Sequence, residues 1–325
     1  MKAMSDSAGK AERSGMTAIE GGTAAIGCER FYPEEGPVRE VAVDSFLIDT
    51  RPVTVGDFDR FVRETGYVTV AEVAPTAEEY PDADPALLVP GSLVFQPSRG
   101  PIPLHDPSAW WAWVPGAQWR HPRGPGSSVA GMRDHPVTQV AYPDAVAYAE
   151  WAGKRLPSEA EWEFAARGGL EGKIFAWGDE ERPNGTLMAN QWQGAFPWRN
   201  EGAKGWRGTS PVGAFPPNGF GLYDVTGNTW EWTSDFFSPR GAGVPAPGEE
   251  PKACCGPPRN PRVDSPDSSY DFGNPGANIP RRVLKGGSHM CSPEYCLRYR
   301  PAARHPEAID TATTHIGFRC AADPA

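Results

Sequence analysis

The sequence predicts an α+β fold with little regular secondary structure, built as a single domain. The 325 residues include 37 glycines and 36 prolines, roughly 22% of the chain and nearly twice the usual share of about 12%. Both residues interrupt helices, which excludes a long helical bundle. Twelve tryptophans argue against disorder, because each buries a large area. Only three short helices have clear start and stop signals.

Each expected helix is bounded by residues that favour a helix end. Capping pairs start the first and third helices, a proline starts the second, and a glycine stops each. The start signals are Thr54 with Asp57, Pro143, and Ser158 with Glu161, and the stop signals are Gly66, Gly153 and Gly168. Residues 38–48 read as one or two strands, and the remainder as loops, turns and short strands.

The chain divides into a tail, a domain and an insertion. Residues 1–16 are polar and are expected to be a disordered tail, followed by one domain over 17–323. Residues 244–280 hold nine prolines and are expected to form a long surface insertion. The tail lacks the apolar core of a secretory signal, which favours a cytoplasmic protein. No apolar run is long enough to span a membrane.

Charge disfavours a nucleic-acid partner, because the net charge is −10. Residues 281–320 form a basic exception, with seven lysines and arginines against three acidic residues. Structural or solvated arginines would explain this segment as well as a binding surface would.

Two cysteines five positions apart, Cys291 and Cys296, follow a Gly-Gly turn. In a reducing compartment a disulfide framework is unfavourable and metal or catalytic thiols are favoured. Two thiolates alone suit Cu(I), whereas structural zinc takes four ligands. His289 could add a third ligand. The alternative is a pair of buried cysteines or an adventitious disulfide.

A second segment carries two carboxylates around a Gly-Asn turn. Asp224 and Glu231 stand seven positions apart and could wrap a hard cation, with backbone carbonyls of the turn adding oxygen ligands, as calcium requires. The alternative is a plain turn with solvated acids.

Other motifs exclude common enzyme classes. The sequence has no Gly-x-Ser-x-Gly and no phosphate-binding loop. Tryptophans at 110, 111, 113 and 119 are expected in the core or in the wall of a groove.

Taken in order, several stretches resemble the formylglycine-generating enzymes of the sulfatase-modifying factor family. The main one is Lys285-Gly-Gly-Ser-His-Met-Cys-Ser-Pro-Glu-Tyr-Cys-Leu-Arg-Tyr-Arg-Pro-Ala-Ala-Arg304. The others are His135-Pro-Val, Trp151-Ala-Gly-Lys-Arg-Leu-Pro157, Glu159-Ala-Glu-Trp-Glu163, Phe215-Pro-Pro-Asn-Gly-Phe-Gly-Leu-Tyr223, Gly227-Asn-Thr-Trp-Glu-Trp-Thr233 and Gly317-Phe-Arg-Cys-Ala-Ala322. Together they span nearly the whole chain. The scaffold stretches occur across the superfamily, whereas the cysteine pair indicates the oxidase.

The resemblance implies a variant of the C-type lectin fold with bound calcium. It also implies an oxidoreductase that converts a cysteine in a Cys-x-Pro-x-Arg motif of a nascent or unfolded sulfatase to Cα-formylglycine. Dioxygen is the implied acceptor, with Cu(I) as cofactor and an external thiol as reductant. The protein is expected to act as a monomer, with no nucleic-acid or membrane partner.

The resemblance also assigns roles to residues. Cys291 and Cys296 match the copper ligands, and Ser288 matches an active-site serine that orients water or oxygen. Trp230, Tyr295 and His315 are the expected substrate-binding residues. The basic segment is then expected to form part of a substrate groove.

Several positions depart from the family pattern. Ser292 follows the first cysteine where histidine is common, and His315 stands where a neutral amide can occur. Cys320 matches a disulfide-bonded cysteine of secretory relatives, but its partner position is Ala149, and Ala166 and Pro301 replace a second pair. Cys254-Cys255 has no counterpart and is taken as incidental.

One calcium ion is expected where the family commonly has two. The retained site maps onto the side chains of Asp224 and Glu231 with the carbonyls of Gly227 and Thr229. The other maps onto Asn190 with the carbonyls of Gln191 and Trp206, but Lys204 takes the place of its aspartate. An ammonium cannot ligate calcium, so this site is expected to be degenerate, or to be filled by Lys204 itself.

Two further function classes stay open. A non-catalytic, lectin-like or sulfatase-binding paralogue would share the scaffold but typically lacks the cysteine pair. An iron-dependent sulfoxide synthase would need a histidine-rich facial site, which this sequence does not offer.

Overall fold

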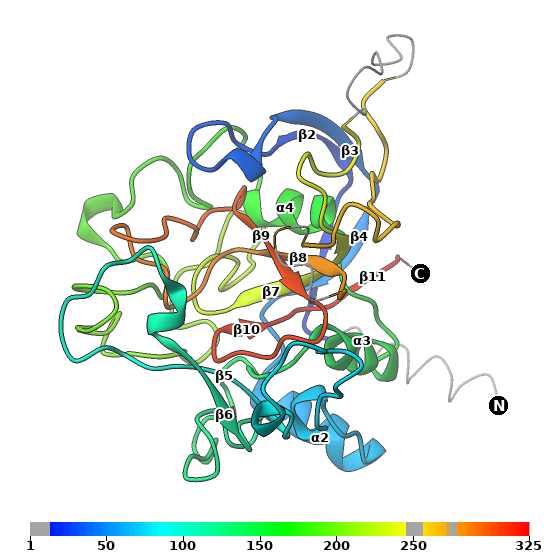
Figure 1. Ribbon diagram of the computed structural model, residues 1–325. Coiled ribbons are helices and arrows are strands. Elements are labelled where there is room, and N and C mark those ends of the chain that lie inside the picture. Colours follow the sequence, from blue (N-terminus) through cyan, green and yellow to red (C-terminus); the bar gives the residue numbers. More distant parts are fainter. Residues whose placement is uncertain (1–13, 245–255, 272, 274–277, 325) are drawn as a thin grey trace.

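A four-stranded sheet lies at the centre of the computed structural model, with helices on either side (Figure 1). The structure describes residues 14–244, 256–271, 273 and 278–324. The sheet order is β10-β7-β8-β9, from strands Trp230–Phe236 (β7), Arg281–Lys285 (β8), Arg304–Ala308 (β9) and Ile316–Gly317 (β10). β8 pairs antiparallel with both β7 and β9, while β10 runs parallel to β7. The end of β8 and the starts of β7, β9 and β10 therefore lie at the same end of the sheet, so the chain segments attached there are close together.

The remaining strands form three smaller sheets. They pair β1 (Met16–Ile19) and β11 (Ala321–Ala322) with β4 (Phe46–Asp49), β2 (Gly22–Ile26) with β3 (Arg39–Val43), and β5 (Gly91–Phe95) with β6 (Trp111–Pro115). β4 lies between β1 and β11, so both ends of the domain are tied to one strand. β1 begins at Met16, the last residue of the stretch expected to be a disordered tail. The Thr50 N–H also donates to the Gly15 carbonyl at 2.9 Å, so residues 15 and 16 are held to the domain. Residues 1–13 lie outside the described part.

The three expected helices are present as α2 (Val55–Thr65), α3 (Tyr142–Trp151) and α4 (Glu159–Arg167). The capping box at Thr54 is complete: its hydroxyl accepts from the Asp57 N–H at 3.1 Å, and its own N–H donates to the Asp57 carboxylate at 3.2 Å. Gly66 and Gly168 end α2 and α4 in the left-handed conformation. Single 3-10 turns at 33–35, 70–72, 85–87, 107–109 and 183–185 interrupt the loops.

Two apolar clusters hold these elements together. One packs α2 and α3 against the central sheet and includes Phe58, Trp119 and Trp232, each at most 2% exposed. The other packs α4 on the β2–β3 hairpin and β4, with Trp162 at its centre. The architecture is the α+β fold of short elements that the sequence predicts.

The described part of the proline-rich insertion is anchored to the domain. Ala42 donates its N–H to Pro258 and accepts from Asn260, and the Val263 N–H bonds the Asp235 carboxylate at 2.8 Å. Cys254 and Cys255 lie outside the described residues.

Candidate active site

Two glycines carry the chain from β8 into the segment that holds the cysteine pair. Gly286 and Gly287 have φ angles of +90° and +70°, a region that favours glycine. A Cβ on Gly287 would lie 2.5 Å from the carbonyl oxygen of Arg298. The missing side chain therefore lets residues 288–298 fold back on their own start, which brings the two cysteines together.

The two cysteines are free thiols that face each other. Cys291 Sγ lies 3.3 Å from Cys296 Sγ. Backbone bonds to two serines fix the intervening turn: Cys291 N–H donates to the Ser288 carbonyl at 3.0 Å and Cys296 N–H to the Ser292 carbonyl at 2.6 Å. Cys291 is 2% exposed, whereas Cys296 is only partly buried. The pair is thus held by the backbone and open on one side.

The first proton leaves this pair from Cys291. Burial alone would raise the pKa of Cys291, but the hydrogen bond from Cys296, the Ser288 N–H at 3.4 Å and the Arg298 charge together lower it. The pKa of Cys296 rises well above its usual value, first because Cys296 donates that hydrogen bond and then because of burial. Ionisation is therefore favoured at Cys291 over Cys296, and the thiolate is the form that binds metals.

All six residues expected at the active site line one cleft of about 380 Å³. They are Trp230, Ser288, Cys291, Tyr295, Cys296 and His315. Tyr295 stacks on Phe196 with ring centroids 4.7 Å apart, and His315 lies 5.0 Å from the Trp111 ring. Residues far apart in the sequence therefore converge on the thiols.

Four further titratable residues line the cleft, and of these only Arg298 was expected there, as part of the basic segment. Tyr32, Arg298, His305 and Glu307 also face this cleft. Tyr32 lies beneath the Arg298 guanidinium at 4.0 Å and accepts the Leu297 N–H. Burial raises the pKa of Glu307 to about 7 and lowers that of His305 to about 4. In the sequence, Arg298 and Glu307 are marked only by their place in the basic segment 281–320, and no local motif marks Tyr32 as a site residue.

The expectation of a basic groove wall is wrong for most of that segment. Lys285, Arg304 and Arg319 are fully buried and form ion pairs with Glu163, Glu159 and Glu231 at 2.7–2.9 Å. Arg300 pairs with Glu35 in the same way. Arg298 is the one lysine or arginine of the described segment that lines the cleft. Most of the excess positive charge in this segment therefore neutralises buried carboxylates, because a buried acid needs a partner.

The tryptophans at 110–119 divide between wall and core. Trp110 and Trp111 line the cleft, while Trp119 lies in the core against Phe58 at 5.2 Å. The expected role of this stripe as core or groove wall is confirmed for these three.

The acidic turn at 224–231 has oxygens that suit calcium, together with competing partners. No donor from the described residues reaches the carbonyl oxygens of Gly227 and Thr229. Asp224 accepts from the Gly213 N–H at 2.7 Å. Both oxygens of Glu231 accept from Arg319, and one also accepts from the Trp162 indole. Calcium here would share Glu231 with an arginine, and it stays a prediction.

At the degenerate calcium position, Lys204 turns away. Its ammonium donates to the Ala214 carbonyl at 2.8 Å and lies over the Phe215 ring. The alternative in which Lys204 fills the site is therefore wrong. Asn190 Oδ1 is buried with no hydrogen-bond partner in the described residues. The Gln191 carbonyl accepts from Gln193, and the Trp206 carbonyl accepts from Ala203.

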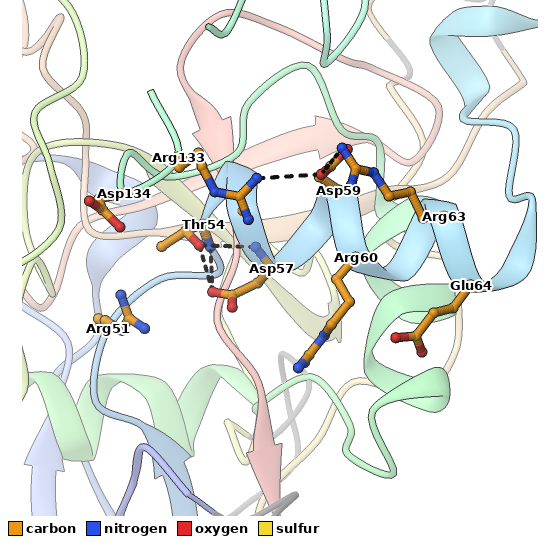
Figure 2. Close-up of a pocket in the computed structure, with 10 residues that line it drawn as sticks. Arg51, Thr54, Asp57, Asp59, Arg60, Arg63, Glu64, Arg133 and Asp134 are labelled. Atoms are coloured by element: carbon orange, nitrogen blue, oxygen red, sulfur yellow. Dashed lines mark hydrogen bonds and ion pairs between the residues drawn. The ribbon is translucent and has the colours of Figure 1, made fainter. Parts of the chain in front are cut away.

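A second, wider cavity of about 560 Å³ lies over the start of α2 and offers different chemistry. Figure 2 shows Arg133 and Arg63 both turned to Asp59, and Asp57 bonded back to Thr54. Four arginines face four carboxylates there, and none of the described lining residues is a cysteine or a histidine. Its charges balance, so the thiol cleft is the better candidate for a reaction.

Comparisons with known proteins agree with this placement. Residues 2–324 match the sulfatase-modifying factor enzyme 1-like domain. The chain is 55% identical to a formylglycine-generating enzyme of Mycobacterium tuberculosis, over 94% of this chain and 97% of that protein. It is 37% identical to an inactive C-alpha-formylglycine-generating enzyme 2 of Mus musculus, over 96% and 87%. PvdO from Pseudomonas aeruginosa shares the fold, with a TM-score of 0.61, 24% identity and coverage of 95% and 94%. No helix in the described residues has the length and apolar character needed to cross a membrane.

Proposed function

Because the chain belongs to the sulfatase-modifying factor family, we propose that it converts a cysteine of a sulfatase polypeptide to Cα-formylglycine. One observation supports this function above the others: two free thiols 3.3 Å apart open into a cleft lined by every expected active-site residue. A substrate cysteine entering the cleft would meet Cys291 and Cys296 at its inner wall.

Copper fits the donor set of this cleft. Two soft thiolates, Cys291 and Cys296, would hold Cu(I) and leave it short of ligands. Bound there, the metal would supply the redox chemistry with dioxygen. Arg298 already favours ionisation of Cys291, so the protein lowers the cost of forming the metal-binding anion.

The surrounding side chains would orient the substrate and limit water. The Ser288 hydroxyl accepts the Met290 N–H at 3.2 Å, which leaves its own proton free to donate into the cleft. Trp230 is 4% exposed and shields one wall. Tyr295 is fixed between Phe196 and Trp110, so its hydroxyl can meet the substrate backbone from a rigid position.

The overall reaction balances with an external reductant. The substrate CH₂–SH carbon loses two electrons and two protons to become a thioaldehyde. Dioxygen takes those electrons and two more from external thiols, with their protons, and becomes two waters. Hydrolysis of the thioaldehyde then gives the aldehyde and hydrogen sulfide.

The non-catalytic alternative predicts binding without turnover, so turnover decides between them. A Cys-x-Pro-x-Arg peptide is incubated with the protein, copper, oxygen and a thiol reductant, and mass spectrometry follows the aldehyde. We expect conversion by the wild type and by Cys28→Ser, whose cysteine lies outside the cleft. Peptide that binds but stays unmodified under all these conditions would favour the alternative.

A further inference from the structure

A third cavity, of about 370 Å³, adjoins the thiol cleft and has no assigned role. Its walls include Trp192, Trp206 and His135. Trp206 is 39% exposed and packs edge-on against the His135 ring at 5.2 Å. The Trp192 indole N–H is buried and has no partner in the described residues. An exposed tryptophan beside an unpartnered donor is typical of a surface that contacts a ligand.

The charge of this cavity has one sign. Arg123 and Arg207 line it, and none of its other described lining residues is a carboxylate. Neither arginine forms an ion pair with any acid that the structure describes. The cavity over α2 differs on this point, because its arginines face an equal number of acids. Two unpaired guanidinium groups beside aromatic walls favour an anionic ligand.

The cavity and the thiol cleft are neighbours along the same chain segments. Met290 lines both. Ser288 faces the cleft and His289 the cavity, and Thr313 and Thr314 divide in the same way. A polypeptide whose cysteine reaches Cys291 can therefore place a nearby residue at the mouth of the cavity.

We propose that this basic, aromatic cavity binds an acidic side chain of the polypeptide substrate, at a position flanking the modified cysteine. The inference rests on the proposed function for the identity of the substrate. The volume suits one or two side chains rather than a folded domain. A glutamate would place its carboxylate on Arg207, with Arg123 as the second positive charge of the wall, and its aliphatic stem on Trp206.

Binding is measured apart from turnover, with peptides in which the reactive cysteine is serine. Fluorescence anisotropy gives the Kd of a series in which Glu, Gln or Lys occupies each flanking position in turn. At one position or two adjacent ones we expect Glu to bind about threefold to tenfold tighter than Gln at low salt, the range for one or two partly exposed ion pairs. The advantage should shrink as salt is added.

Three variants assign the effect to the cavity. Arg207→Gln should remove most of the Glu advantage, and Arg207→Glu should reverse it in favour of Lys. Arg199→Gln is the matched control, because Arg199 is a nearby exposed arginine outside the cavity, and it should keep the advantage. All three changes are at exposed positions, so folding is expected to survive.

Two results would overturn the proposal: a Kd that ignores charge at every scanned position, or a Glu advantage that persists in both Arg207 variants. Formylglycine production is assayed separately with the cysteine-bearing peptides. Charge-dependent binding without any aldehyde would contradict the proposed function and leave the acidic subsite standing. Aldehyde formation with charge-independent binding would do the reverse.

Discussion

The thiol cleft and the buried ionic cluster share strands β7 to β9 but treat charge in opposite ways. The buried ionic cluster is Glu159, Glu163, Glu231, Lys285, Arg304 and Arg319. Every one of its side chains is at most 2% exposed, and each has an opposite charge within 3 Å. In the cleft, Glu307 forms no ion pair with any lysine or arginine that the structure describes and lies 4.0 Å from His305, and the two thiols lie beside each other.

The pKa directions show the same contrast. Burial would raise the pKa of Glu163, but Lys285 and Arg167 outweigh it and hold that pKa well below its usual range. Burial raises the pKa of Glu307 to about 7, although hydrogen bonds from Thr311 and the Ala308 backbone and the charge of Arg281 act against it. Paired charges therefore join the central sheet to α4, while the two thiols and Glu307 have no such ion pair in the described residues and stay available to a ligand.

The largest effect is expected from the thiols. Cys296→Ser should lower kcat/KM by more than about 100-fold, because even an outer partner of a metal ligand can be worth that much. The free energy of unfolding should change by no more than about 1 kcal/mol, since Cys296 is only partly buried. Peptide kinetics and urea unfolding measure the two quantities. Full activity of metal-depleted Cys296→Ser would contradict the copper mechanism.

Breaking the buried ionic cluster should instead lower the free energy of unfolding. Glu163→Gln removes the carboxylate that pairs with Arg167 and leaves Lys285 with Glu159 at 3.9 Å. The change should cost about 3 to 5 kcal/mol of unfolding free energy. Asp179→Asn is the control, because its pair with Lys173 is about half exposed on both sides and should cost less than about 1 kcal/mol. Equal urea midpoints for the two variants would show that burial does not set the value of these pairs.

Metal analysis tests the expected calcium site at 224–231, which includes Glu231 of the buried ionic cluster. We propose one tightly held ion at 224–231, and its removal should lower stability by about 2.7 kcal/mol if the free ion stands at a hundred times its Kd. Metal analysis after dialysis should find one ion in the wild type and two in Lys204→Asp, which restores a carboxylate beside Asn190. Two ions in the wild type, or none, would refute this assignment.

A smaller effect is expected at Glu307. Its folded pKa of about 7 exceeds the ordinary 4.5, so between these values the folded state holds a proton that the unfolded state has lost. Stability therefore falls as pH rises through this window. Glu307→Gln should be about 1 to 3 kcal/mol more stable than wild type at pH 8 and equal to it at pH 4. Thermal unfolding at both pH values checks this, and an equal offset at the two would exclude the ionisation of Glu307 as the cause.

Local signals in the sequence were enough for part of this comparison. Capping residues placed the three helices, since Thr54 with Asp57 and Ser158 with Glu161 act within one turn. The thiol spacing and the family resemblance placed the cleft residues. The partners of charges could not be predicted, because Lys285 meets Glu163 across 122 positions of sequence. A basic run therefore looked like a surface when most of it is interior.

The most direct test of the account is Cu(I) binding, in competition with a chelator and without oxygen. The claim is that the cleft keeps two thiols free for a metal, while the six charges of the buried ionic cluster are paired with one another. We expect one high-affinity Cu(I) per chain in the wild type and in Cys28→Ser, and none in Cys291→Ser or Cys296→Ser. High-affinity binding that survives the loss of either cleft cysteine, or its absence from the wild type, would contradict the account.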